Sequence, residues 1–240
     1  MHDDSPVALS DIDFDQVYAG GEAFAGMRFE RVPWDFGGPQ PAVVELEAAG
    51  EISGAVLDAG CGLGENALFL AARGYHVTGV DAASGAVEQA RARAAERGLD
   101  AEFAVADATR LDGFESRFDT VVDSALYHCL DSVQRTAYSA ALHRATAPGA
   151  RLHLVCFSDA IPGTLPVTKD DLRAHLGGHW NIDRIDETRY STAFTRELLR
   201  RQRAESDLDR LGVTFDPDAL DVDERDRVLI PAWRLRAVRA

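Results

Sequence analysis

The chain has 240 residues, 46% of them hydrophobic, with a formal net charge of −15 and a pI near 4.8. This size and apolar content suit one globular α/β domain with some elaboration. So acidic a chain lacks the clustered Lys and Arg that phosphate backbones require, which predicts a small-molecule ligand and no nucleic-acid surface. The three cysteines show neither metal-type spacing nor a disulfide framework. An acidic N-terminus without a long apolar run favours a cytoplasmic protein with no membrane segment.

The first conspicuous run along the chain is Pro33–Pro41, which reads PWDFGGPQP. Aromatic residues among Pro and Gly do not suit the interior of a helix or strand, so the run predicts a fixed loop. The flat face of Trp34 can cover a ligand and attract a cationic centre. Alternatively, Trp34 anchors the N-terminal arm to the core. We therefore divide the chain into an N-terminal arm with cap loop, residues 1–45, and a main domain, residues 46–240.

The central part alternates segments typical of strands and helices, which predicts a parallel sheet covered on both faces. The strands are expected at Ala55–Ala59, Tyr75–Val80, Ala101–Ala106, Phe118–Val122 and Arg151–Phe157. The helices are expected at Glu65–Arg73, from Ser84 to about Gly98, from Asp131 to Ala147 before a Pro148-Gly149 turn, and after Thr168.

After Tyr190 the chain is longer than it needs to be. A minimal α/β domain would need only a short link between its last two strands. An irregular apolar stripe predicts a helix from about Thr195 to Leu211, and the acid-rich run Asp216–Asp226 predicts a solvated loop. A closing strand is expected at Arg227–Val238, where Pro231 indicates an edge or a bulge. The insertion at about 191–226 could form a lid, a dimer contact or surface decoration.

The most informative stretch runs from Val56 to Asp81, because a glycine loop there lies between two acids. A tight glycine turn after a buried strand lets a ligand approach the N-terminus of the next helix. Asp58 at the strand tip would repel a pyrophosphate, and Glu65 stands where a dinucleotide fingerprint needs its third glycine. The loop therefore favours a ligand with a positive end, such as the ammonium of S-adenosylmethionine.

Acids also end the next three predicted strands, at Asp81, Asp107 and Asp123. Ligands of open α/β sheets bind outside the carboxyl ends of the strands, so these side chains and Asp58 should converge on one crevice. Asp81 is placed for a ribose diol, as the acid about twenty residues after such a loop is in ribose-binding folds. Taken singly, each aspartate could instead form a turn or cap a helix.

These residues resemble class I S-adenosylmethionine-dependent methyltransferases, and the Pro-Trp-Asp run is similar to small-molecule members that act on halides, thiols, quinones or heterocycles. The resemblance implies a three-layer Rossmann-like α/β fold with a seven-stranded, mostly parallel sheet whose last strand is antiparallel. It implies that the glycine loop and Asp58 hold the methionine part, Asp107 and Ala108 the adenine, and that Trp34 covers the sulfonium. The residues expected to bind the cofactor are Trp34, Asp58, Gly60, Cys61, Gly62, Gly64, Asn66, Asp81, Ala82, Asp107, Ala108 and Asp123.

The segment from Asp123 to Leu130 follows the fourth strand, where such enzymes place residues between cofactor and acceptor. Methyl transfer mainly needs alignment and exclusion of water, and a base helps only if the acceptor must lose a proton. His128 has a suitable ordinary pKa for that base, and Tyr127 offers a hydroxyl for orientation. His128 could equally cap or pack in a loop. We treat Cys129 as packing, and no metal site is expected.

The sequence thus predicts transfer of a methyl group to O, N or S of a small aromatic or heterocyclic acceptor, by a monomer or a homodimer. Two alternatives stay open. An NAD-linked oxidoreductase is disfavoured by Asp58 and by the missing third glycine. A non-catalytic cofactor-binding regulator would use the insertion to contact a partner.

Overall fold

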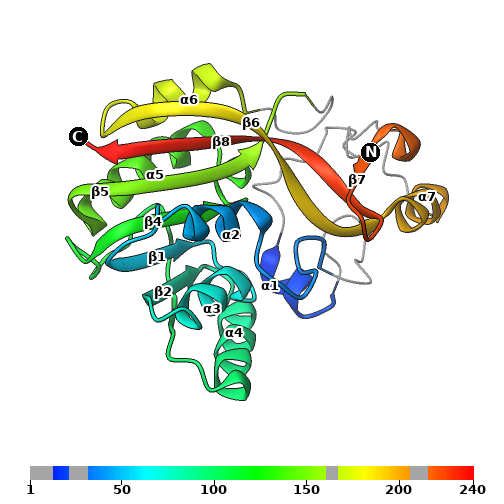
Figure 1. Ribbon diagram of the computed structural model, residues 1–240, viewed down its shortest axis with the longest axis horizontal. Coiled ribbons are helices and arrows are strands. Elements are labelled where there is room, and N and C mark those ends of the chain that lie inside the picture. Colours follow the sequence, from blue (N-terminus) through cyan, green and yellow to red (C-terminus); the bar gives the residue numbers. More distant parts are fainter. Residues whose placement is uncertain (1–12, 22–31, 161–166, 206–215) are drawn as a thin grey trace, which may run out of the picture.

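The computed structural model describes residues 13–21, 32–160, 167–205 and 216–240. Its strands form one sheet in the order β3-β2-β1-β4-β5-β8-β6, with β7 paired to β8 (Figure 1). The strands are β1 Ala55–Ala59, β2 His76–Asp81, β3 Glu102–Val105, β4 Phe118–Ser124, β5 Thr146–Phe157, β6 Trp180–Thr195, β7 Asp221–Val222 and β8 Arg227–Arg239. The helices are α1 Phe14–Tyr18, α2 Pro41–Ala48, α3 Glu65–Ala71, α4 Ser84–Arg97, α5 Ser132–Ala145, α6 Lys169–Leu176 and α7 Arg196–Glu205, with short 3₁₀ turns η2 Tyr127–Cys129 and η4 Pro217–Ala219.

The strand directions confirm the predicted Rossmann-like architecture. Strands β3, β2, β1, β4 and β5 are parallel, and β8 runs antiparallel to both β5 and β6. The two-residue strand β7 is added to the seven that the sequence predicts. The chain leaves β1 toward β2 on one side and later returns to β4 on the other. The carboxyl ends of β1 and β4 therefore form the topological switch point, where such sheets bind ligands.

Helices cover the sheet on both faces. Successive residues of β1 fall in different core clusters, since Val56 packs with α2, α3 and α4, while Leu57 packs with α5 and α6. Both β1 residues are fully buried. A strand with water on neither face reads as a continuous apolar run, which is how this strand appears in the sequence.

The transition from α5 to β5 differs from the prediction. Helix α5 ends at Ala145 and β5 begins at once, so Pro148 and Gly149 lie inside the strand and not in a turn before it. Phe118 of β4 pairs with Thr146, but Thr120 pairs with Arg151, so the residues between bulge out of the ladder. A bulge accommodates the missing N–H of a proline and the left-handed backbone of Gly149, whose φ is 78°.

Two further expectations, both for the C-terminal part of the chain, differ from the structure. Strand β8 is not an edge strand, because β5 and β6 flank it. Pro231 nevertheless lies just past the end of the β5 ladder, and its carbonyl accepts a hydrogen bond from the Ser158 N–H. The acid-rich run predicted as a loop contains η4 and β7. Leu208 and Leu211 of the predicted apolar stripe lie outside the described residues.

The longest ladder of the sheet joins β6 to β8 and continues to the pair Thr195 and Arg227, beyond the end of β5 at Phe157. Figure 1 shows these two strands twisting away from the sheet toward α7 and β7. We call this extension, residues 189–195 and 227–231, the hairpin arm. Residues 191–195, expected in the insertion, continue β6, so the chain leaves the sheet only at Arg196.

Candidate functional site

A cleft lies at the switch point, and segments that are distant in the sequence line it. They are the cap loop, the glycine loop between β1 and α3, the tip of β4, and β6. Its lining residues are Trp34, Asp35, Gly38, Gln40, Gly60, Cys61, Gly62, Leu63, Gly64, Glu65, Asn66, Ser124 and Tyr190. The cap loop and glycine loop both line the cleft, as the sequence predicts. Ser124 lies in the segment predicted to face the acceptor, although it was not singled out there, and Tyr190 was not expected at the site.

The glycine loop keeps most of its own N–H groups occupied. The N–H of Gly60 donates to the Val80 carbonyl (2.9 Å), and that of Gly62 donates to Asp81 Oδ2 (2.8 Å). Gly60, Gly62 and Gly64 all have left-handed φ values of 69°, 52° and 84°. Glycine is needed here because it adopts left-handed φ values without strain and because it lets neighbouring groups lie close to the loop backbone. An added side chain would fill the space above the loop.

Two neighbours lie close above the glycines. A Cβ on Gly60 would lie 2.7 Å from Cβ of Leu126, and one on Gly62 would lie 2.8 Å from the hydroxyl of Tyr18. Leu126 belongs to the segment predicted to lie between cofactor and acceptor, and Tyr18 belongs to α1. The glycine loop therefore exposes only backbone atoms between Leu126 on one side of the site and Tyr18 on the other.

Asp58 is the most deeply enclosed acid of the site, with 1% of its surface exposed. Its Oδ2 accepts a hydrogen bond from the Ala67 N–H at 3.1 Å, while Oδ1 is fully enclosed and has no partner. Burial raises the pKa of Asp58 to about 7, and the nearby charges of Asp123 and Asp81 add to the shift. An unsatisfied buried acceptor beside the glycine loop fits a ligand with a cationic hydrogen-bond donor, as the ammonium of S-adenosylmethionine is.

Asp81 ties the glycine loop to the start of α4. Its Oδ2 accepts the Gly62 N–H, and its Oδ1 accepts the Ala83 N–H at 2.9 Å. Burial raises the pKa of this half-buried carboxyl, and the two backbone bonds oppose the rise. Each carboxylate oxygen can accept a further hydrogen bond, so Asp81 can still receive both hydroxyls of a diol.

The other two strand-tip acids are engaged in local structure. Buried Asp123 accepts hydrogen bonds from the N–H groups of Leu126 (2.9 Å) and Tyr127 (3.4 Å) and from the Tyr138 hydroxyl (2.8 Å). Burial raises its pKa to about 7. Asp107 is exposed, and its Oδ1 accepts both the N–H and the hydroxyl of Thr109. The adenine contact of Asp107 stays a prediction, beside the turn-forming role that these bonds display.

The remaining residues expected at the cofactor differ in exposure. Cys61 and Ala108 are buried at 9% exposure, Ala82 is exposed, and the Asn66 side-chain oxygen accepts the Gln40 N–H at 2.9 Å. Asn66 thus joins α3 to the end of the cap loop.

Helix α1 completes the cap, although the sequence analysis assigned it no role. The Trp34 Nε1–H donates to the hydroxyl of Tyr18 at 2.9 Å, and the Phe14 ring lies 5.8 Å from the Trp34 ring. Asp15 accepts the Gly85 N–H at the start of α4 (3.1 Å). Phe14 and Tyr18 have the i, i+4 spacing of one helix face after the N-cap Asp13, but a single such pair is a weak signal in the sequence.

The cap loop is held from two sides. Arg93 of α4 joins Asp35 of the cap loop (2.7 Å) to Glu65 of α3 (2.7 Å). On the opposite side, the Gln40 side chain exchanges two hydrogen bonds with the backbone of Ser191 in the hairpin arm. The cap loop therefore connects the glycine loop to the arm.

The predicted catalytic residues are both buried. Tyr127 is 0% exposed, belongs to the larger core cluster and has a hydroxyl without a partner. It has no surface from which to contact an acceptor in this conformation. The ring of His128, 4% exposed, stacks on Phe157 with centroids 3.9 Å apart. Burial, with the positive charge of Arg135, lowers the pKa of His128 to about 3.

Aromatic side chains from three elements form a stack that begins at Tyr190, which lines the cleft. Phe157 stacks on His128, and its centroid lies 5.5 Å from that of Tyr190 in an edge-to-face arrangement. We call His128, Phe157 and Tyr190 the aromatic wall. The Tyr190 hydroxyl interacts with Ser124 and Gln40, yet Ser124 Oγ, fully enclosed, forms no hydrogen bond of good geometry. Phe157 and Tyr190 of the wall share a small apolar cluster with the half-buried Trp34 and with Ile230.

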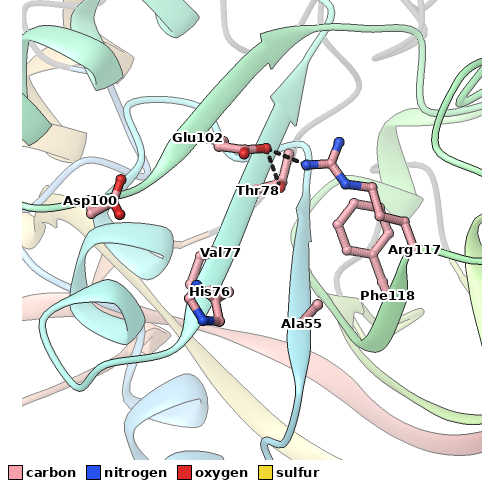
Figure 2. A pocket seen from close by; sticks show the side chains of 8 residues that line it. All are labelled: Ala55, His76, Val77, Thr78, Asp100, Glu102, Arg117 and Phe118. Carbon is pink, nitrogen blue, oxygen red and sulfur yellow. Dashed lines mark hydrogen bonds and ion pairs between the residues drawn. The ribbon is translucent and has the colours of Figure 1, made fainter.

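A second pocket lies at the opposite edge of the sheet, where β1, β2 and β4 begin (Figure 2). Three of its polar side chains bond to one another, since Glu102 accepts from the Thr78 hydroxyl at 3.1 Å and from Arg117 at 2.5 Å. It is remote from the carboxyl ends of the strands, so we assign it no chemistry. Within the described ranges, no helix has the length and apolar character needed to cross a membrane, and no three metal-ligating side chains gather.

Comparisons with known proteins agree with this geometry. Residues 56–149 match a methyltransferase domain family. The chain is 41% identical over 165 residues to a 2-heptyl-1-hydroxyquinolin-4(1H)-one methyltransferase of Mycobacteroides abscessus, a match covering 66% of this chain and 73% of that protein. A solved structure concerning the conversion of a disulfide bond into a thioacetal group in echinomycin biosynthesis is 38% identical, with a TM-score of 0.75 over 94% of this chain and 90% of that one. The fold also resembles a Burkholderia thailandensis 1,6-didemethyltoxoflavin-N1-methyltransferase (21% identical, TM-score 0.57, 83% and 77% covered).

Proposed function

Because the chain belongs to the class I S-adenosylmethionine-dependent methyltransferases, we propose that it methylates O, N or S of a small aromatic or heterocyclic acceptor. The observation that carries the proposal is the aromatic wall beside the cleft. Tyr190 of the wall lines the cleft with Phe157 in edge-to-face contact behind it, so an aromatic acceptor in the cleft would meet an aromatic side chain with which planar rings pack favourably. The name of the Mycobacteroides relative, which specifies a heterocyclic quinolinone, supports the same class of acceptor.

The residues present fit the methyl donor, which when bound supplies an electrophilic methyl group on a cationic sulfur. Asp58 Oδ1 would accept from its ammonium, and Asp81 would accept from its ribose hydroxyls. The face of Trp34 would lie near the cationic centre. Tyr18 and Trp34 close the cap over the glycine loop and keep water from the reacting atoms. The chain's contribution to the rate is thus positioning and exclusion of water.

Removing the hydroxyl that holds the cap should weaken donor binding moderately. In Tyr18→Phe the Trp34 Nε1–H loses its acceptor, a change of about 0.5–1.5 kcal/mol for one neutral hydrogen bond. We expect calorimetry to show S-adenosylhomocysteine bound roughly two- to tenfold more weakly. Tyr75→Phe, at a tyrosine next to β2 and outside the cap, is the matched control and should bind as the unmodified protein does. Equal affinity for Tyr18→Phe would show that the cap bond does not support the donor site.

The acceptor class is tested by measuring transfer of labelled methyl from S-adenosylmethionine to phenols, quinones, thiols and N-heterocycles. The proposal expects turnover with planar aromatic members and little with aliphatic thiols of equal acidity. Tight S-adenosylhomocysteine binding without transfer to any member would support a non-catalytic cofactor-binding regulator instead. Binding of NADH in place of S-adenosylhomocysteine would support an oxidoreductase and overturn the donor assignment.

A further inference from the structure

Tyr190 of β6 brings a hydroxyl to the cleft. Resting on the proposed function, we infer that Tyr190 is a specificity-determining residue, whose hydroxyl donates a hydrogen bond to a ring nitrogen or ring-borne oxygen of the acceptor other than the methylated atom. The buried amide of Gln40 is the positioning residue that aims this hydroxyl. The enzyme therefore prefers heterocyclic acceptors to carbocyclic ones of the same shape.

The Tyr190 hydroxyl lies where several elements of the cleft meet. Tyr190 lines the cleft, and its hydroxyl interacts with Ser124 and Gln40, which line the cleft as well. Only 4% of Tyr190 is exposed, so the part that a ligand can touch is small and lies at the cleft. The pKa of Tyr18 is raised mainly by burial, and Tyr190 is among the nearby groups that add to the rise. Because a Cβ on Gly62 would lie 2.8 Å from the Tyr18 hydroxyl, Tyr190 is close to the cover of the glycine loop.

The Gln40 amide has a fixed orientation. Its Oε1 accepts the Ser191 N–H at 3.2 Å, and its Nε2 donates to the Ser191 carbonyl at 2.9 Å. A backbone N–H can only donate and a carbonyl can only accept, so these two bonds determine which end of the amide is the nitrogen. Gln40 is buried, and its backbone N–H donates to the Asn66 side-chain oxygen at 2.9 Å. Gln40 therefore ties the residue that follows Tyr190 to the first turn of α3.

The same amide directs the hydrogen of the Tyr190 hydroxyl. Ser191 uses one N–H of Gln40 Nε2, and the second N–H remains for the phenolic oxygen. Burial raises the pKa of Tyr190, and the contacts with Ser124 and Gln40 oppose the rise, as donors to its oxygen do. An oxygen that receives these contacts keeps its own hydrogen for a third partner. A ligand in the cleft can be that partner.

The charges around Tyr190 make it a neutral donor. Burial raises its pKa far above neutral pH, and Cys129 and Asp123 add to the rise. The pKa of Cys129 is itself raised to about 12, chiefly by burial and then by Asp123 and Asp81, while Arg135 opposes the rise. Tyr190 therefore keeps its proton, and the acids disfavour an anion beside it. The atom that receives the hydrogen bond is a neutral nitrogen or oxygen.

The chemistry of methyl transfer decides which atom of the acceptor Tyr190 contacts. A lone pair of the nucleophile forms the bond to the methyl carbon, so a hydrogen bond to that lone pair would withhold it from the reaction. A hydrogen bond to a second atom of the ring instead fixes the orientation of the ring. A carbocyclic ring offers no second atom of this kind and would leave the buried hydroxyl without its partner.

The test compares isomeric hydroxyquinolines and quinolinethiols with the matching naphthols and naphthalenethiols, which have the same shape without the ring nitrogen. The measured quantity is the ratio of kcat/KM between the best heterocyclic isomer and its carbocyclic match, in the unmodified protein and in Tyr190→Phe. We expect Tyr190→Phe to lower this ratio roughly two- to tenfold, as for one neutral hydrogen bond, and to leave S-adenosylhomocysteine affinity unchanged. Comparing the two proteins cancels differences in intrinsic reactivity between the compounds.

Tyr75→Phe is the matched control and should keep the ratio of the unmodified protein. If the compounds are methylated but Tyr190→Phe leaves the ratio unchanged, the inference about Tyr190 fails while the proposed function stands. If no compound of the series is methylated, the proposed acceptor class fails, and the inference fails with it.

Gln40→Met tests the positioning role, because methionine has a similar volume and no amide. We expect it to lower the same ratio as Tyr190→Phe does, and the double variant should show no further loss, since both changes remove one interaction. A merely structural role of Gln40 would lower kcat/KM equally for both members of a pair, and an unchanged ratio would overturn the role assigned to it. If Gln40→Met fails to fold, Gln40→Glu takes its place, because it keeps an oxygen for the Ser191 N–H and lacks the amide N–H groups.

Discussion

Exchanging Asp58 for Asn is expected to stabilise the free protein at pH 8 by about 2–4 kcal/mol and to weaken donor binding at the same time. Each pKa unit corresponds to about 1.4 kcal/mol, and burial raises the pKa of Asp58 from 3.8 to about 7. The charged form is therefore costly in the folded state. The asparagine side chain would still offer an oxygen to the Ala67 N–H while carrying no charge.

The pH dependence of this effect follows from the direction of the shift. Because the folded pKa lies above the unfolded one, the folded state binds the proton more tightly, and stability falls as pH rises from about 4 to about 7. At pH 8 the full cost of the buried charge is present, and Asp58→Asn removes it. At pH 5, which lies only about one unit above the unfolded pKa and about two units below the folded one, most of the cost has not yet developed, so the gain should be roughly a third of that at pH 8.

Thermal or urea unfolding at pH 5 and pH 8, with and without S-adenosylhomocysteine, measures both effects. Asp112→Asn, which replaces an exposed carboxylate, is the control and should change neither stability nor binding appreciably. The ligand should stabilise Asp58→Asn less than it stabilises the unmodified protein, since Oδ1 no longer offers a negative partner. A variant that is destabilised at pH 8, or that binds the ligand equally well, would contradict this account of Asp58.

Gly60→Ala should disable the site and destabilise the fold. Residue 60 has a φ of 69°, and an added Cβ would lie 2.7 Å from Cβ of Leu126, a backbone-proximal atom that cannot swing aside. Left-handed backbone costs a non-glycine residue about 1–2 kcal/mol, and forced overpacking adds about 1–3 kcal/mol. We expect a loss of about 2–5 kcal/mol in the free energy of unfolding and at least tenfold weaker S-adenosylhomocysteine binding.

Gly74→Ala is the matched control for this substitution. Gly74 also has a left-handed φ, 86°, but a Cβ there would meet nothing within 4 Å. It should therefore show only the cost of the backbone, about 1–2 kcal/mol, and unchanged binding. Urea unfolding and calorimetry on the pair isolate the contact with Leu126. If the two variants lose the same stability and the same affinity, the close contact between residue 60 and Leu126 does not contribute to either.

The strand tips were predictable because their signals are local. Apolar runs followed by an acid mark β1, β2 and β4, and the charges of Asp123 and Asp81 both raise the pKa of Asp58. Asp107 was expected among them, but it lies exposed and caps its own turn at Thr109. Sequence spacing places an acid at a strand end and does not say whether the side chain turns inward.

Strand β6 was harder to locate from the sequence. A register shift between Ile182 and Arg184 puts Ile182 and Ile185 three residues apart, although both pack against the same core cluster. The bulge breaks the alternation of period two on which strand prediction depends. Tyr190, farther along the same strand, comes to the cleft beside Ser124 only through the order of strands in the sheet, so its own sequence neighbourhood carries no signal for the site.

Helix α1 escaped prediction for a different reason. Five residues form little more than one turn, too short for an apolar periodicity to be distinguished from chance. Its position is set by tertiary contacts, chiefly the bond between Trp34 and Tyr18 and the contact of Asp15 with α4. Isolated helices of this length do not persist in water, so the body of the domain must hold α1 in place.

The double attachment of the cap loop bears on how variants of this enzyme will combine. Arg93 fastens the loop beside the donor, and Ser191 fastens it to the arm that carries Tyr190. Residues that are coupled through the same loop do not contribute independently to stability or binding. Changes made in the arm to widen acceptor choice will therefore be epistatic with changes near the donor. A library that varies Tyr190 should vary the cap loop in the same round.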